Sequence, residues 1–268
     1  MKKNIFITTA LSLLLIQVFA QQKITIEDIW TKGTFRPDYV WGINWMKDGA
    51  FYSSLERTEN GNNIIKNSIK TGNKIATIVE GKNLINPATG SPIEFDGYEF
   101  NADETKILFT TETESIYRRS SKSIYFLYDL KSKKLNNLSE DKQMFATYSP
   151  DANKVAFVKE NNLFFVNSST NKEVKITKDG AKNEIINGWC DWVYEEEFGF
   201  AKAFFWSPDG TKLAYYRFNE KDVPEYNMQM WGNLYPKDYK FKYPKAGEKN
   251  SVVEIKIYDT KTGKTTNV

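Results

Sequence analysis

A run of three carboxylates, Glu195–Glu197, is the part of this sequence with the clearest capacity for chemistry. Aromatic side chains flank the run, with Trp192 and Tyr194 before it and Phe198 after it. Aromatic walls lower the local dielectric constant, and carboxylates held together there repel one another unless a cation joins them. The run therefore predicts a site for a positively charged ligand such as an amine. The alternative is an ordinary solvated charged face, which residue types alone do not exclude.

The composition limits the chemistry that this chain performs by itself. It contains no histidine and no Gly-x-Ser-x-Gly sequence, so a serine–histidine–aspartate triad cannot be assembled from it. Its single cysteine, Cys190, cannot form an internal disulfide, and we expect a small, partly buried side chain there and not a reactive thiol. One cysteine and no histidine argue against a zinc or copper site of the common kinds, so we expect no metal and no cofactor. A calcium site with oxygen ligands stays open, although no loop has the acid pattern of an EF-hand.

The charges of the chain give no sign of a nucleic-acid partner. There are 37 basic and 34 acidic residues, for a formal net charge of +3, and the two signs are interspersed and not gathered in blocks. A basic patch or stripe would be needed to follow a phosphate backbone. We therefore expect no nucleic acid among the partners.

The N-terminus has the layout of a secretory signal peptide. Two lysines, Lys2 and Lys3, precede an apolar run that ends in Val-Phe-Ala at Ala20. We expect residues 1–20 to be a signal peptide, residues 21–268 to be the mature chain, and the protein to be exported to the periplasm or the exterior. The apolar run is interrupted by polar residues and is shorter than the roughly 20 residues of a spanning helix, so no stable membrane span is expected. A retained anchor is the weaker alternative.

A short pattern recurs four times along the chain. Each copy is a polar turn that contains aspartate, followed by a strand rich in apolar residues. The four turn aspartates are Asp48, Asp103, Asp151 and Asp209. Their separations of 55, 48 and 58 residues lie near the period of propeller blades with four strands. A second pair of strands, joined by a polar turn, follows within three of the units, at residues 124–135, 163–176 and 253–268.

We therefore predict an all-β fold, a partial β-propeller of about four to five four-stranded blades. The aromatic content of 15% also favours strands. The alternative is a β-sandwich with irregular hairpins. Two stretches depart from the repeat, residues 188–200 and residues 220–250, and we expect the first, which carries the glutamates, to be a short helical insertion. Insertions in a repeat array lie in loops on one face, commonly the binding face.

Residues 191–197, DWVYEEE, resemble the glutamate motif of the dipeptidyl peptidase IV branch of the prolyl oligopeptidase family. Further segments agree with that family and follow in its order. They are residues 205–215 (FWSPDGTKLAY), 217–220 (RFNE), 223–224 (VP) and 243–247 (YPKAG), with Asn250. The opening segment, residues 24–37, is similar to bacterial members. The resemblance covers most of the mature chain and is most specific from about residue 188 to residue 250.

The resemblance implies both a fold and a substrate site. In that family an N-terminal propeller of eight blades caps a C-terminal α/β-hydrolase domain that holds the Ser-Asp-His triad. The propeller's two glutamates, which match Glu196 and Glu197, bind the free α-ammonium of the substrate and so measure off a dipeptide. An arginine from an earlier blade binds a backbone carbonyl of the substrate. Alignment on residues 128–130 places Arg118 there, with Arg119 as the neighbouring alternative.

The implied partner is a peptide with a free N-terminus, cleaved after proline or alanine, and the full-length protein is expected to be a homodimer. The chain departs from the family because it ends at Val268, before the later blades and the hydrolase domain. We therefore expect a propeller portion of an exported dipeptidyl peptidase, truncated before its hydrolase domain and inactive alone. The alternative is a non-catalytic periplasmic or surface propeller that acts as a binding module. A sugar-processing propeller is disfavoured because no pair of carboxylates on different blades stands out.

Overall fold

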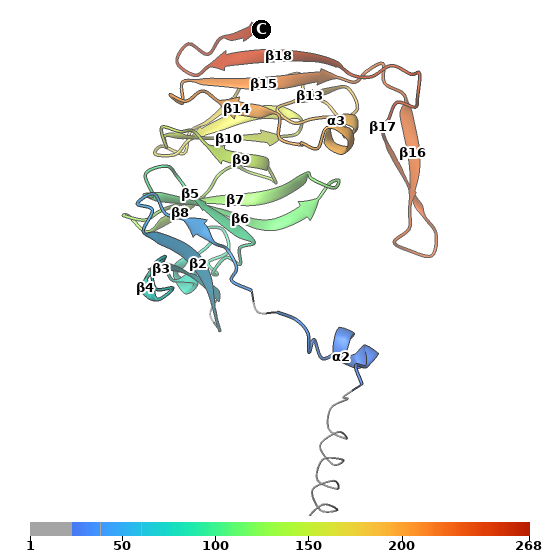
Figure 1. The fold of residues 1–268 in the computed structure, drawn as a ribbon. Coiled ribbons are helices and arrows are strands. Elements are labelled where there is room, and N and C mark those ends of the chain that lie inside the picture. The colour runs from blue at the N-terminus through green and yellow to red at the C-terminus, as the bar shows by residue number, and fades with distance from the viewer. Residues whose placement is uncertain (1–22, 38, 60) are drawn as a thin grey trace, which may run out of the picture. The chain divides into compact units, whose positions relative to one another are not determined.

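The computed structural model describes residues 23–37, 39–59 and 61–268, and the predicted signal peptide lies outside them (Figure 1). The chain divides into two compact units, residues 1–40 and residues 41–268. In the first unit a short helix, α2 (Ile26–Trp30), begins at Thr25, which forms a capping box with Asp28. No helix within the described ranges is long and apolar enough to cross a membrane.

In the described part of the second unit, four antiparallel sheets of four or five strands follow one another in sequence order, and Figure 1 shows them stacked; a fifth sheet has only two strands. The first sheet is formed by β1 (Asn44–Trp45), β2 (Phe51–Thr58), β3 (Gly61–Ser68) and β4 (Lys74–Val79). A short 3-10 helix, η2 (Gly81–Asn83), leads to the second sheet, which is formed by β5 (Gly97–Phe100), β6 (Lys106–Ser115), β7 (Ser121–Asp129) and β8 (Lys134–Asn137). The third sheet is formed by β9 (Met144–Tyr148), β10 (Lys154–Lys159), β11 (Asn162–Asn167) and β12 (Glu173–Lys175). The fourth sheet is formed by β13 (Ile185–Asn187), β14 (Phe204–Trp206), β15 (Lys212–Asn219), β18 (Val252–Asp259) and β19 (Thr265–Asn267).

The core lies between successive sheets, because the inner strands bury side chains on both faces. In β6, Ile107 and Phe109 join a cluster with the first sheet, whereas Leu108 between them joins a cluster with the third sheet. In β10, Val155 packs toward the second sheet and Ala156 toward the fourth. Successive side chains of a strand point to opposite faces, so a continuous apolar run is needed at these positions. This series of four stacked blades confirms the prediction of an all-β partial propeller and excludes the two-sheet sandwich for the described residues.

The turn aspartates predicted from the repeat each accept a hydrogen bond from the backbone N–H two residues later. The four donors and distances are Ala50 at 3.0 Å, Thr105 at 3.3 Å, Asn153 at 3.2 Å and Thr211 at 3.0 Å. An aspartate that hydrogen-bonds to the backbone in this way mimics a backbone turn. The repeat thus marks the hairpin between the first two strands of each blade.

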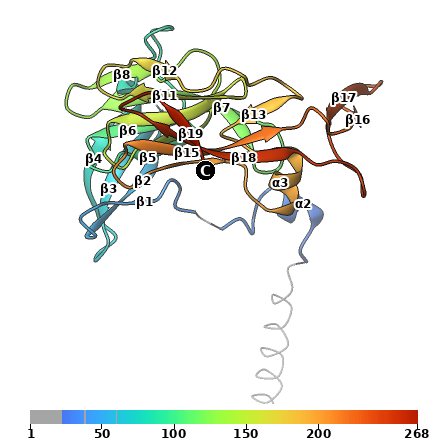
Figure 2. The same ribbon diagram turned by 90° about the horizontal axis from the view of Figure 1, so that it is seen from above.

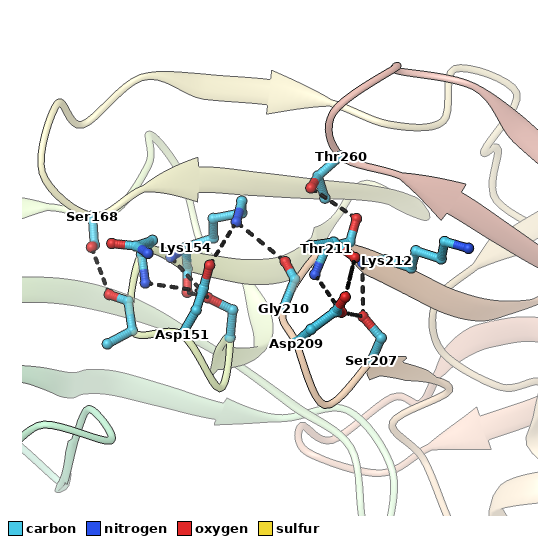
Figure 3. A network of polar contacts seen from close by, with 12 residues as sticks. Asp151, Lys154, Ser168, Ser207, Asp209, Gly210, Thr211, Lys212 and Thr260 are labelled. Atoms are coloured by element: carbon cyan, nitrogen blue, oxygen red, sulfur yellow. Dashed lines mark hydrogen bonds and ion pairs between the residues drawn. The ribbon is translucent and has the colours of Figure 1, made fainter.

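One lysine joins two of these turns. Lys154 Nζ donates to Asp151 Oδ2 at 3.1 Å within the third blade and to the carbonyl oxygen of Gly210 at 3.2 Å in the fourth (Figure 3). Gly210 has a φ of +65°, and a Cβ there would lie 2.7 Å from the carboxyl carbon of Asp151. A side chain at residue 210 would therefore both strain the turn of the fourth blade and displace the carboxylate of Asp151 in the third.

The two departures from the repeat are confirmed as insertions in the fourth blade. β13 and β14 both pair antiparallel with β15, at Asn187 opposite Arg217 and at Phe204 opposite Tyr215. The innermost strand is thus split, and residues 188–203 leave it and return, carrying the helix α3 (Trp192–Glu197). The second insertion forms a hairpin of β16 (Glu225–Met230) and β17 (Lys237–Lys242), which stands apart from the stacked sheets in Figure 1 and Figure 2.

Candidate functional site

The helix α3 begins at Asp191, whose side chain caps it. Asp191 Oδ1 accepts from the backbone N–H of Tyr194 at 3.0 Å, and Oδ2 accepts from the hydroxyl of Ser251 at 2.5 Å. An α-helix turns about 100° per residue, because 3.6 residues complete a turn. The three glutamates that follow therefore cannot share one direction, and each meets a different environment.

Glu195 points inward and is fully buried. Its Oε1 atom accepts from the backbone N–H groups of Arg119 at 2.6 Å and Ser120 at 2.9 Å, both in the connection between β6 and β7. Its Oε2 atom is buried and has no hydrogen-bond partner among the described residues. The sequence predicted Glu195 only as one member of the carboxylate run. The available signal was its position four residues after Asp191, on the same buried side of a helix.

Glu196 meets an arginine from the second blade. Its Oε2 atom accepts from Arg118 Nε at 2.9 Å, across 78 residues of sequence. The side chain of Arg118 is 72% exposed, whereas that of Glu196 is 18% exposed. An ion pair with one partner in solvent contributes only about 0–1 kcal/mol, so a charged ligand can compete for either group. The structure thus brings together two of the three predicted site residues.

The side chain of Glu197 is exposed, and its carboxylate forms no hydrogen bond or ion pair with any residue that the structure describes. Arg119, the alternative to Arg118, extends toward the residues just after α3: a Cβ added to Gly199 would be 3.7 Å from its Nη2 atom. The ion pair with Glu196 is formed by Arg118. The roles of these residues toward a substrate stay a prediction.

Aromatic rings pack around Tyr194 of the helix α3. The ring of Tyr194 lies 4.8 Å from Phe198, 5.8 Å from Phe200 and 4.9 Å from Phe218, measured between centroids. Edge-to-face and tilted ring pairs at such distances stabilise packing beyond simple burial. The alternative of a plain solvated face is wrong for Glu195, which is fully buried.

The β16–β17 hairpin contacts both halves of the site, which the sequence did not predict. The hydroxyl of Tyr117, the residue before Arg118, lies 3.2 Å from the hydroxyl of Tyr239. Trp192, the first residue of α3, packs on Phe241 at 6.2 Å and on Tyr243 at 4.7 Å between centroids. The strand β17 and the residues after it therefore form a common support for the arginine and the glutamates.

A cavity of about 580 Å³ lies beside this support and does not include Arg118, Glu196 or Glu197 in its lining. Glu220 lines it and is 5% exposed. Burial, with a smaller contribution from the negative charge of Asp191, raises the pKa of Glu220 to about 7, although the positive charge of Lys242 opposes the shift. The cavity adjoins the glutamate site without being part of it.

Cys190 is completely buried, and its thiol donates to the carbonyl oxygen of Phe200 at 2.9 Å. Burial, and secondarily the charges of Glu195 and Asp191, raise the pKa of the thiol far above its usual range. A thiol that stays protonated is a poor nucleophile, which agrees with the expectation of an unreactive side chain, although Cys190 is fully and not partly buried. Within the described ranges, no three histidine, cysteine, aspartate or glutamate residues lie close enough to hold a metal ion together.

Comparisons with known proteins agree with this architecture. The chain is 33% identical over 236 residues to dipeptidyl peptidase 4 of Trichophyton rubrum, covering 84% of this chain and 28% of that protein. It is 31% identical over 246 residues to the human prolyl endopeptidase FAP, covering 88% of this chain and 30% of that protein. The chain thus spans less than a third of the length of these relatives.

Two solved structures resemble the fold. The crystal structure of Porphyromonas gingivalis dipeptidyl peptidase 4 matches with a TM-score of 0.81 and 37% identity, over 92% of this chain and 35% of that one. A dipeptidyl aminopeptidase IV homologue from Bacteroides ovatus matches with a TM-score of 0.61 and 21% identity, over 92% of this chain and 32% of that one, which supports the fold alone. The family described as the dipeptidyl peptidase IV N-terminal region matches residues 101–268. This match covers both α3 and the Arg118 connection, and the chain therefore belongs to the dipeptidyl peptidase IV N-terminal region family.

Proposed function

We propose that this chain is the substrate-binding propeller portion of an exported serine-type dipeptidyl peptidase, which removes Xaa-Pro or Xaa-Ala dipeptides from the N-terminus of peptides. The ion pair between Arg118 and Glu196, next to the exposed Glu197, carries the proposal. We call these three residues the clamp. The chain contains no histidine, so the proposal assigns the acylating serine and its base to residues outside this chain.

In the proposed complex, the carboxylates of Glu196 and Glu197 accept hydrogen bonds from the α-ammonium group of the peptide. A carboxylate and an ammonium group form hydrogen bonds roughly twice as strong as neutral ones. When the ammonium group replaces Arg118 as the ion-pair partner of Glu196, the exposed guanidinium of Arg118 can donate to a backbone carbonyl of the substrate. The bound amine then fixes which peptide bond reaches the nucleophile, two residues along the chain.

Replacement of Glu197 by glutamine in the full-length protein tests the proposal. Release of p-nitroaniline from Gly-Pro p-nitroanilide is expected to fall about 100-fold in kcat/KM, because a neutral amide replaces one of two charge-assisted acceptors. Glu140→Gln, at an exposed glutamate that makes no hydrogen bond or ion pair with the clamp, is the matched control and is expected to change little. Unchanged release by Glu197→Gln would refute the clamp.

The competing function is a non-catalytic binding propeller, which would use the same blades and the same clamp. Absence of any dipeptide release from the full-length wild-type protein, together with saturable binding of a peptide that has a free N-terminus, would favour this alternative.

Export and a homodimer are further parts of the proposal. The layout of residues 1–20 supports export, and mass spectrometry of the secreted protein is expected to find Gln21 as its first residue. The β16–β17 hairpin supports a dimer, because Trp231, Leu234 and Tyr235 at its tip are 70%, 86% and 80% exposed. Light scattering of the full-length protein should give twice the monomer mass, and Trp231→Ser should shift it toward the monomer.

A further inference from the structure

We infer that Glu195 is a positioning residue for the clamp: it holds the connection that carries Arg118 against the helix that carries Glu196 and Glu197. This inference rests on the proposed function. It concerns the first carboxylate of the run, which does not face the solvent and does not line the clamp.

The connection between β6 and β7 depends on few bonds of its own. Its ends are joined by the backbone N–H of Ile116, which donates to the carbonyl of Ser120 at 2.8 Å. The hydroxyl of Ser120 also accepts from the N–H of Tyr117 at 3.2 Å. Of the three remaining N–H groups, those of Arg119 and Ser120 both donate to Glu195 Oε1. The side chain of Glu195 therefore links the main chain of this connection to the fourth blade.

Arg118 itself cannot fix this connection. Its side chain is 72% exposed, and Glu196 is its ion-pair partner in the described part of the chain. In the proposed function a substrate amine takes over Glu196, so that contact is given up when the peptide binds. The bonds from Arg119 and Ser120 to Glu195 are buried and do not involve the clamp carboxylates. They therefore persist while the clamp exchanges partners.

The two carboxylate oxygens of Glu195 differ in their hydrogen bonding, so the role of its acceptor atom can be tested separately from that of its charge. Both backbone donors use Oε1, and Oε2 has no hydrogen-bond partner among the residues described. Glutamine keeps a carbonyl oxygen that can accept from both N–H groups, and its amide nitrogen replaces an atom that accepts no bond there. Methionine has a similar length and no strong acceptor, so it leaves two buried N–H groups without a partner. The inference predicts that glutamine preserves the clamp and that methionine does not.

The test is a double-mutant cycle in the full-length protein, measured as kcat/KM for Gly-Pro p-nitroanilide. Glu195→Met is expected to lower kcat/KM about tenfold in the wild-type background, whereas Glu195→Gln stays within about threefold. In an Arg118→Ala background the same methionine substitution is expected to cost less than about twofold, because the residue that it positions is already absent.

An equal loss in both backgrounds would overturn the inference, because it would show a structural role that does not pass through Arg118. No loss in the wild-type background would overturn it as well. Failure of the proposed function has a different signature, since then Arg118→Ala by itself leaves kcat/KM unchanged or the wild type releases no dipeptide.

Amide hydrogen exchange tests the bonds to Glu195 without the methionine variant, so it also serves where that variant does not fold. In the wild type and in Glu195→Gln, the amides of Arg119 and Ser120 are expected to exchange more slowly than that of Arg118, for which the structure gives no hydrogen-bond acceptor among the described residues. Equally fast exchange of all three in the wild type would contradict the anchoring bonds.

Discussion

Glu220 shows how burial of a single carboxyl group sets a dependence on pH. The residue begins the second insertion, is 5% exposed, and has a pKa near 7 in place of the usual 4.5. Below pH 4.5 the group is protonated in both the folded and the unfolded chain. As the pH rises from 4.5 to 7, the unfolded chain loses this proton and the folded chain keeps it, so the free energy of unfolding falls. Above pH 7 the loss is complete and constant.

Replacement of Glu220 by glutamine should remove this dependence. At pH 8 the variant is expected to be more stable than the wild type by about 3 kcal/mol, the equivalent of a shift of roughly two and a half pKa units, and at pH 4.5 nearly equal to it. Urea unfolding of the chain at both pH values measures the difference. Glu140→Gln, an exposed control, should give the same small change at each pH. A gain for Glu220→Gln that does not depend on pH would contradict the assignment.

At the same scale, the sequence could indicate the glutamate run but not which of its three side chains is buried, which is ion-paired and which is exposed. Three adjacent carboxylates between aromatic residues predicted a cation site, and the resemblance selected Glu196, Glu197 and Arg118. The anchoring role of the buried Glu195 was missed. The N–H groups that donate to its carboxylate, those of Arg119 and Ser120, lie about 75 residues earlier in the sequence. A contact between backbone and side chain at that separation leaves no local pattern.

At the scale of elements, the turn between the first two strands of a blade also connects one blade to the next. Gly49 and Gly210 occupy the same position, directly after Asp48 and Asp209, with φ values of +67° and +65°. A Cβ at Gly49 would meet no atom within 4 Å, whereas at Gly210 it would collide with the carboxylate of Asp151. That carboxylate is bound by Lys154, which also reaches the carbonyl of Gly210 (Figure 3).

Alanine at the two glycines therefore separates backbone strain from the contact between blades. Gly49→Ala is expected to lower the free energy of unfolding by about 1 kcal/mol, the usual penalty of a left-handed conformation for a residue with a Cβ. Gly210→Ala is expected to cost about 1–2 kcal/mol more, because it also displaces Asp151 from Lys154. Urea unfolding of both variants measures the difference. Equal costs would show that the contact between the blades does not contribute.

The elements themselves were largely predictable. Aspartate turns and apolar runs located β6, β10 and β15, because their chemistry is local. The split inner strand was not predictable, since β13 has three residues and its pairing with β15 is fixed only by the fold. The hairpin of β16 and β17 was expected as an insertion, but its packing on Tyr117 and Trp192 joins segments that no sequence pattern connects.

At the scale of the whole second unit, the clamp is assembled from blades that are not neighbours in sequence. Arg118 comes from the second blade and the glutamates from an insertion in the fourth, while the third blade packs between them through two buried clusters. The distance between arginine and glutamates thus depends on the packing of β10 and β11 on both sides. The stacking of the blades thus brings Arg118 and Glu196 together although they lie far apart in sequence.

In the proposed function the clamp recognises a free N-terminal amine, so a substrate in which that amine is blocked is the most direct test. The measurement is kcat/KM of the full-length protein for Ala-Pro p-nitroanilide and for its N-acetylated form, which differ only in the charge at the N-terminus. We expect acetylation to lower kcat/KM by at least about 100-fold, because the ammonium group that Glu196 and Glu197 bind in the proposed complex is lost. Equal cleavage of the two substrates would contradict it and would indicate an endopeptidase that does not use this clamp.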